Sequence, residues 1–286
     1  KTHILWGVLF LLFIPILTNV PALEKLVTHT REDKIDWVYM AQVSFFVVAG
    51  LSLIVLAIRD FIETREAGSL LLLLWVMGTF IFAAFINWTN NGRSNLPMLP
   101  AVGILIARAI ERRYDVTALT KRWRLYAPLA PALILALFVS HADYAFANSG
   151  RDVARMLNEK YISKGETLWF QGHWGFQYYM EAYGARPFDR NTPRIRTGDL
   201  MVRSYNNSNI SDMPEALFYI TLIEVINNPL PRTMAVMSFR PRAAGFYSSV
   251  FGAIPYVFGH TETDRYGVVR LRSPKFPALP AQPPGR

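Results

Sequence analysis

Long apolar segments dominate the first half of this 286-residue chain. A helix needs about 17 to 25 apolar residues to cross a bilayer, and helices satisfy their own backbone hydrogen bonds within hydrocarbon. The segments therefore predict about five transmembrane helices, which restricts this half of the chain to a helical membrane fold. The expected spans are Ile4–Leu23, Trp37–Ile58, Ser69–Ile86, Leu96–Ile110 and Tyr126–Phe146.

The composition changes near residue 148. Leu, Ile, Val, Phe and Ala are abundant before it, whereas Arg, Asn, Gly, Pro and Tyr separate short apolar runs after it. Helix-like and strand-like patterns alternate in this second half, which predicts a small α/β extramembrane domain. We therefore expect a transmembrane helical domain over 1–148, an α/β domain over 149–272 and a Pro-rich tail over 273–286.

The α/β domain has a predicted order of elements. Apolar residues at helical spacing predict three helices, and short apolar runs predict four strands. The expected helices are Arg151–Tyr161, with Ser149 as its N-cap, Phe176–Tyr183, which ends at Gly184, and Pro214–Val225. The expected strands are Thr167–Phe170, Leu200–Arg203, Thr233–Phe239 and Tyr266–Leu271.

Basic residues give the membrane part an orientation. The link between the fourth and fifth expected spans is rich in Arg and Lys, and such residues collect in cytoplasmic loops. Residues after 146 are then external, so we expect a multi-pass protein with an external α/β domain, which in a bacterial inner membrane is a periplasmic domain. Arg108 is expected to snorkel to the headgroups. The net charge of +9 favours anionic lipid or substrate over nucleic acid as the partner.

A polar turn, Asn87–Pro100, separates the third and fourth expected spans. Unpaired backbone is costly in hydrocarbon, so such a turn must lie at an interface or line a protected cavity. Arg93 offers a fork of N–H donors for a phosphate at a helix start. The alternative is an interfacial arginine that contacts ordinary lipid headgroups. Asn91 and Asn95 offer amides for the same ligand, although turn formation is the other explanation for both.

A second group of polar and aromatic residues follows the expected strand Thr167–Phe170. His173 lies in the loop after this strand, where functional residues are frequent. It would act as an acid or base, or bind a sugar that stacks on Trp169 and Trp174. The alternative is a loop histidine packed against aromatic rings. Glu181 lies nearby in sequence, as a contact of the same site or as a surface charge.

Two stretches resemble bacterial GT-C membrane glycosyltransferases of family 39, which include protein O-mannosyltransferases and aminoarabinose transferases. The first is Arg93-Ser-Asn-Leu-Pro-Met-Leu-Pro100, and the second is Trp169-Phe-Gln-Gly-His-Trp-Gly-Phe-Gln-Tyr-Tyr-Met-Glu181, followed by Gly184-Ala-Arg-Pro187. The resemblance covers the C-terminal half of such an enzyme. It implies a polyprenyl-phosphate-linked sugar as donor, with Arg93 on the phosphate.

The resemblance leaves the catalytic residue unassigned. These enzymes carry a catalytic carboxylate in the first long external loop, and Glu32, Asp33 and Asp36 do not match its pattern. The expected function is therefore an incomplete GT-C-like module. The alternative is a non-catalytic accessory subunit that packs against other membrane protein subunits of a larger complex.

Other chemistry has little support in the sequence. The five histidines are scattered without the spacing of paired metal ligands, so we expect no metal site. The chain has no cysteine, which excludes disulfides and thiolate catalysis. We expect no cofactor apart from the polyprenyl-phosphate sugar as a donor substrate.

Overall fold

The computed structural model groups the chain into two compact units. The first contains Lys1–Ala142 and Arg232–Thr261, and the second contains Asp143–Pro231 and Glu262–Arg286. The boundary at Ala142 falls within one long helix, α7. The sequence placed residues 232–261 in the α/β domain, so their membership of the first unit was not predicted. The described residues are 28–29, 34–87, 91–114, 126–189, 194–208, 210–211, 218–231, 233–239, 242–248, 251–259 and 263–274.

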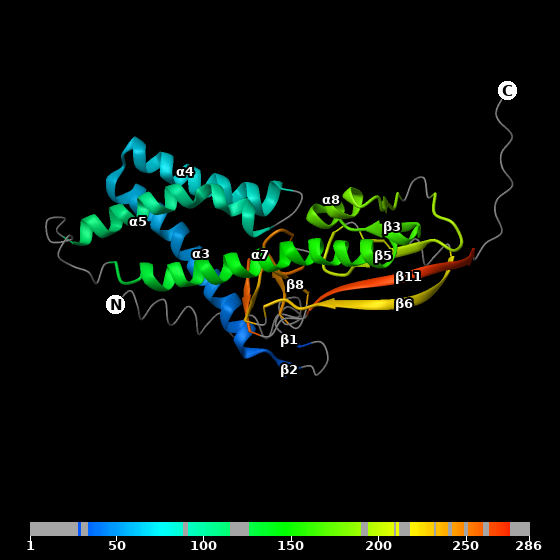
Figure 1. Ribbon diagram of the computed structural model, residues 1–286. Coiled ribbons are helices and arrows are strands. Elements are labelled where there is room, and N and C mark those ends of the chain that lie inside the picture. The colour runs from blue at the N-terminus through cyan, green and yellow to red at the C-terminus, as the bar shows by residue number, and fades with distance from the viewer. Residues whose placement is uncertain are drawn as a thin grey trace, which may run out of the picture. The chain divides into compact units, whose positions relative to one another are not determined.

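Three of the described helices are long and apolar enough to cross a membrane, so this is a membrane protein. Large apolar side chains on these helices, such as Phe45, Leu71 and Leu137, are more than half exposed, as expected for helices that face lipid. The three helices are α3 (Trp37–Thr64), α4 (Ala67–Ile81) with its continuation η1 (Phe82–Ile86), and α7 (Leu129–Lys160) (Figure 1). They coincide with three of the expected spans.

The other two expected spans are not confirmed. Ile4–Leu23 lies outside the described residues. In place of Leu96–Ile110 the structure has α5 (Leu99–Arg113), whose 15 residues would be about 22 Å long, less than the roughly 30 Å of a hydrocarbon core. It follows directly on η2 (Gly92–Met98), a 3-10 helix that contains Pro97. The total of about five spans therefore stays a prediction.

The helices α3, α4 and α5 pack around a small apolar core, and Figure 1 shows α4 and α5 side by side. Small residues in this core allow close approach of the helices, which is a common way to associate helices within a membrane. Its buried residues are Ala57, Leu72, Val76, Ala101, Val102 and Leu105.

An ion-pair cluster closes one end of this bundle. Asp60 is buried, and its Oδ2 accepts a hydrogen bond of 3.2 Å from Nη1 of Arg108. Arg112 binds the other oxygen of Asp60, and its Nη1 also donates to Glu63 at 3.0 Å. Arg108 was expected to snorkel, but it donates instead to Asp60 and to Oγ of Ser69 at 2.9 Å. The buried carboxylate needs these partners, because an isolated charge is costly to bury.

The second unit contains a five-stranded mixed sheet in the order β4-β3-β5-β11-β6. Strands β3, β4 and β5 are parallel, whereas β11 is antiparallel to both β5 and β6. Apolar residues of α7 and α8 (Trp174–Ala182) pack on one face, among them Leu157, Phe176 and Met180. The strands are β3 (Leu168–Gln171), β4 (Arg186–Pro187), β5 (Leu200–Ser204), β6 (Phe218–Asn228) and β11 (Asp264–Pro274).

A 3-10 helix, η4 (Ile162–Lys164), and several short strands complete the described secondary structure. β7 (Met234–Ala235) pairs with β10 (Val257–Phe258), and β8 (Met237–Ser238) pairs with β9 (Ala244–Gly245). These four lie in residues 232–261 of the first unit, where the sequence predicted a single strand over Thr233–Phe239. Near the start of the described residues, β1 (Thr28–His29) pairs with β2 (Lys34–Ile35).

Two expectations for the second unit are wrong. The segment Pro214–Val225 was predicted as a helix, but from Phe218 onward it belongs to strand β6. Its β-branched and aromatic residues pair along β11, and this pairing outweighs a helical spacing that the apolar run also satisfies. Ser149 is not an N-cap, because α7 runs through it without interruption.

Ser149 instead belongs to a buried polar cluster between α7 and β11. Its Oγ donates to Oδ2 of Asp264 at 2.6 Å, and the hydroxyl of Tyr266 donates to the same oxygen at 2.7 Å. The other oxygen of Asp264, Oδ1, has no hydrogen-bond partner in the structure as described. Burial raises the pKa of Asp264 to about 6, although the two hydroxyl groups partly oppose this shift.

Asp264 should therefore make stability depend on pH. Its pKa is higher in the folded chain than in the unfolded chain, so its contribution is present below about pH 4 and is lost as the pH rises through about 6. The lost free energy of unfolding is on the order of 3 kcal/mol, because the pKa of about 6 in the folded chain lies well above the ordinary pKa of an aspartate. Urea unfolding from pH 4 to 8 should show the unfolding free energy of the wild type falling relative to that of Asp264→Asn.

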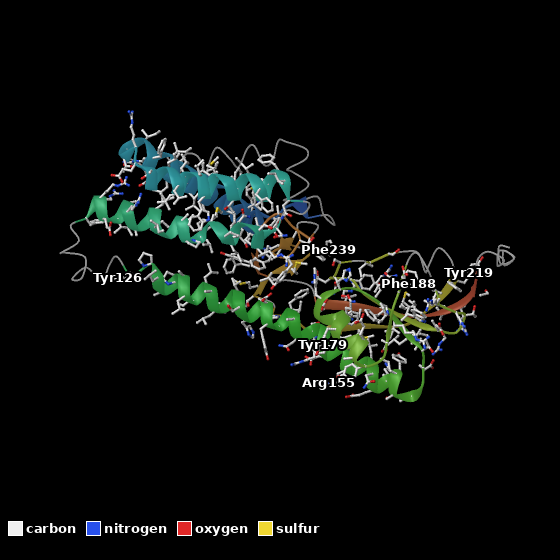
Figure 2. All side chains as sticks on the ribbon, turned by 90° about the horizontal axis from the view of Figure 1, so that it is seen from above. Tyr126, Arg155, Tyr179, Phe188, Tyr219 and Phe239 are labelled. Carbon is white, nitrogen blue, oxygen red and sulfur yellow. The ribbon has the colours of Figure 1, made fainter. Side chains whose placement is uncertain are left out.

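Asp152→Asn is the matched control for this prediction. Asp152 pairs at the surface with Arg155, which projects from α7 (Figure 2). Its profile should run parallel to that of the wild type. Parallel profiles for the wild type and Asp264→Asn would contradict the role of Asp264.

Candidate functional site

The polar turn is held by its own asparagine side chains. Asn91 is buried, and its Oδ1 accepts hydrogen bonds from the backbone N–H of Ser94 at 2.9 Å and from Oγ of Ser94 at 2.8 Å. Asn87 donates to the same Oγ at 2.9 Å. Asn95 contacts the carbonyl of Asn91 at 3.5 Å, a long hydrogen bond. Asn91 is thus the N-cap of η2, and its side-chain oxygen serves the fold of the turn.

Arg93 differs from these asparagines because its side chain is exposed. Within the described part of the chain, no acceptor contacts its guanidinium. Side chains three residues apart in a 3-10 helix lie on the same side. Arg93 and Leu96 therefore lie on the same side of η2, and Leu99 begins α5 directly after it; the two leucines are 47% and 53% exposed. The turn therefore presents a cation, Arg93, followed along the chain by the exposed apolar side chains of Leu96 and Leu99.

A distant segment covers the polar turn. We call the described residues of 233–259 the cap; it contains β7 to β10. The backbone N–H of Arg93 donates to the carbonyl of Phe246 in the cap at 3.2 Å. A Cβ atom added at Gly92 would lie only 2.8 Å from Cβ of Pro255, also in the cap. The cap and the turn therefore fit closely, and only a glycine leaves room at position 92.

An exposed aromatic ring packs on a buried one in the cap. The rings of Phe239 and Phe251 lie 4.2 Å apart between their centroids, and Phe239 is labelled in Figure 2. A backbone crossing forms beside them, because a Cβ at Gly245 would lie 2.2 Å from the carbonyl oxygen of Gly252. Two glycines seven residues apart were the only sequence signal for this crossing.

The cap is also tied to the beginning of α3. Arg242 binds both oxygens of Asp36, from Nε to Oδ2 at 2.8 Å and from Nη2 to Oδ1 at 3.3 Å. Burial alone would raise the pKa of Asp36. The hydrogen bonds from Arg242 and from the backbone of Tyr39, together with the charge of Arg242, hold this pKa below its ordinary value. Asp36 is therefore a carboxylate at neutral pH and is already occupied by a cation.

The second predicted site lies at the carboxyl end of β3. The backbone N–H of His173 donates to Oδ1 of Asn207 at 2.9 Å, and Nδ2 of Asn207 donates to the carbonyl of His173 at 3.2 Å. The His173 ring contacts Oε1 of Gln177 at 2.9 Å, and Gln177 donates to Glu181 at the same distance. His173, Gln177 and Glu181 thus form one exposed row along α8.

The two tryptophans of this predicted site are separated. Trp174 is 43% exposed and begins α8 next to His173. Trp169 is only 6% exposed and lies in a core with Phe188 on the sheet face opposite α8. Its Nε1 donates to Asp199 at 2.8 Å, and Arg186 lies over its ring. The structure therefore groups His173, Trp174 and Glu181, but not Trp169.

No metal centre is formed by the residues that the structure describes. Among them, no three His, Cys, Asp or Glu side chains lie close enough together to hold an ion. Of the five histidines, His141 and His173 have described side chains, and both are exposed. The predicted lack of a metal site stays a prediction for the chain as a whole.

Comparisons with known proteins do not assign this chain to a family. No protein-family model matches it, and neither does any curated protein or solved structure. The resemblance to GT-C glycosyltransferases therefore stays a prediction.

The close fit at Gly92 leads to a prediction. Gly92→Ala should push the cap away from the polar turn, and overpacking of this kind costs about 1 to 3 kcal/mol of unfolding free energy. Gly103→Ala is the control, because a Cβ at Gly103 in α5 meets nothing within 4 Å. Thermal unfolding in detergent should show a lower midpoint for Gly92→Ala only. Equal midpoints for the two variants would show that the cap does not press on Gly92.

Proposed function

We propose that this chain is a GT-C-like membrane glycosyltransferase module, and that its polar turn binds the phosphate of a polyprenyl-phosphate sugar. The observation that carries the proposal is the exposed face of Arg93, Leu96 and Leu99. A phosphate attached to a long hydrocarbon chain matches this face, because its charged head would contact Arg93 and its apolar chain would contact the two leucines. A soluble anion would have no use for the apolar part of this face.

The chemistry of Arg93 suits such a ligand. A guanidinium donates two parallel hydrogen bonds to a phosphate, and these are stronger than bonds between neutral groups. Asn91, Ser94 and the cap fix the backbone of the turn, so less conformational entropy is lost on binding. As the sugar leaves, the same guanidinium would stabilise the charge that develops on the phosphate.

The proposal includes a location. For this location we take η2 and α5 together, residues 92–113, as the fourth span, because α5 alone is too short. Arg93 then lies near one end of the span, and Arg112 and Arg113 lie at the other. The basic link that follows Arg113 favours the cytoplasmic side. Arg93 and the α/β domain would then be periplasmic in a bacterial inner membrane, where the exposed row of His173 and Glu181 is available to a sugar or an acceptor.

A second function has one observation in its favour. A catalytic carboxylate must be free to act as a base, but both oxygens of Asp36 accept hydrogen bonds from Nε and Nη2 of Arg242. Glu32 and Asp33 lie outside the described residues. A non-catalytic accessory subunit, which binds the lipid or packs against other subunits, would need no free carboxylate.

Lipid binding in nanodiscs tests the proposal. Arg93→Ala should weaken the binding of polyprenyl phosphate about tenfold or more, because charge-assisted hydrogen bonds are worth roughly 1.5 to 3 kcal/mol. Arg93→Lys should bind with intermediate affinity, since it keeps the charge but loses the fork. Arg113→Ala, at the other end of α5, is the control and should bind like the wild type.

Two comparisons decide the interpretation. Polyprenol, which lacks the phosphate, should bind weakly to the wild type and equally to Arg93→Ala. Displacement of polyprenyl phosphate by an equal amount of phosphatidylglycerol would instead identify Arg93 as an ordinary headgroup arginine. Transfer of sugar from a polyprenyl-phosphate sugar by the purified chain would favour the enzyme, and binding without transfer would favour the accessory subunit.

A further inference from the structure

We propose that Asp36 and Arg242 are positioning residues for Arg93: their ion pair holds the cap on α3, and the cap holds the polar turn in its binding conformation. This inference rests on the lipid-phosphate site proposed above. It assigns a role to two residues that lie 206 positions apart in sequence.

The ion pair has the geometry of a specific contact. Arg242 contacts both oxygens of Asp36, and the two side chains are only 17% and 13% exposed. Partial burial shields them from water and salt, so the pair is worth more than an ordinary surface ion pair. The remaining Nη1 of Arg242 donates to the carbonyl of Phe258 at 2.8 Å. One guanidinium therefore joins the start of α3 to strand β10.

Further contacts place the cap in the same position on α3. The backbone N–H of Phe258 donates to Oε1 of Gln42 at 2.7 Å, and the hydroxyl of Tyr39 donates to the carbonyl of Ala243 at 2.8 Å. The rings of Phe46 and Tyr256 meet edge to face with centroids 5.1 Å apart. Residues 36, 39, 42 and 46 follow helical spacing, so one face of α3 and its N-cap contact the cap.

A second set of contacts joins the cap to the polar turn. Phe246 accepts the backbone N–H of Arg93, and both Phe246 and Pro255 lie against Gly92. Ala243, Phe246 and Pro255 belong to one short, compact segment with crossing strands. A displacement of the cap from α3 is therefore transmitted to the two residues that set the direction of the Arg93 side chain.

Breaking the ion pair should lower the affinity for polyprenyl phosphate without changing the preference for the phosphate over polyprenol. Arg93 keeps its guanidinium when the ion pair is broken, but the turn loses its fixed position and must be ordered on binding. Binding of polyprenyl phosphate should weaken about tenfold, while the preference for the phosphate over polyprenol persists. Loss of Arg93 itself removes that preference, so the two kinds of variant differ in their signature.

The variants distinguish the ion pair of Asp36 from its second role as the N-cap residue of α3. Asp36 also accepts the backbone N–H of Tyr39 at 3.0 Å as the N-cap of α3. Asp36→Asn keeps an N-cap residue but removes the charge, and Arg242→Gln removes the other partner. Arg242→Lys keeps the charge and should restore part of the affinity. Arg270→Gln is the control, because Arg270 forms a similar pair with Glu166 in the other unit.

Two measurements are made on each variant, as the full chain in nanodiscs. The first is the dissociation constant for polyprenyl phosphate. The second is the mobility of a nitroxide spin label attached to Arg93→Cys, which is a unique labelling site because the chain has no cysteine. Asp36→Asn and Arg242→Gln should each raise the mobility, and the double variant should add little, since both act through one pair.

The outcomes distinguish this inference from the proposed function. Increased label mobility together with tenfold weaker binding, absent in Arg270→Gln, supports the positioning role. Unchanged mobility in both Asp36→Asn and Arg242→Gln overturns it, whatever the lipid result. If the wild type binds no polyprenyl phosphate, the proposed function fails, and with it the link to affinity, whereas the mobility still decides whether the pair positions residue 93.

Discussion

The need to satisfy backbone hydrogen bonds at the ends of membrane helices governs the arrangement of the first unit. The polar turn between α4 and α5 meets this need in three ways. Asn91 and Ser94 bond to each other, Trp75 donates to the carbonyl of Pro97 at 2.9 Å, and Phe246 of the cap accepts the N–H of Arg93. These contacts satisfy the backbone without the guanidinium of Arg93, which no acceptor contacts among the described residues.

Two carboxylates that are shielded from water, one partly and one fully buried, impose a related constraint at the two ends of α3. Asp36 precedes the helix and is paired with Arg242, while Asp60 lies near its end and is paired with Arg108 and Arg112. Each acid is neutralised by arginines from distant segments, which fixes those segments on the helix. The same requirement is only partly met at Asp264, where two hydroxyl groups replace an arginine and the pKa rises.

The sequence predicted where helices and strands lie better than it predicted which of them pack or pair with each other. Strands β3, β5 and β11 and helix α8 were located correctly, because each combines a clear apolar pattern with a distinct stop such as Gly184. Strand β6 was mistaken for a helix, since a short apolar run fits either period and only its pairing with β11 decides between them. The exposure of Arg93 beside a helix start was likewise accessible from local sequence, whereas the cap above it was not.

Sequence alone determined the local preferences of this protein: three long apolar helices, a polar turn with one arginine, and a second half with short strands and fewer long apolar runs. These depend on spacing within a few residues, which a single sequence records directly. Tertiary structure decided which distant groups meet. It placed the cap on the polar turn, paired Asp36 with Arg242, directed Arg108 to Asp60, and buried Trp169 away from His173. Such contacts arise from the packing of segments that are far apart in the chain, and the local pattern of each segment is compatible with many partners.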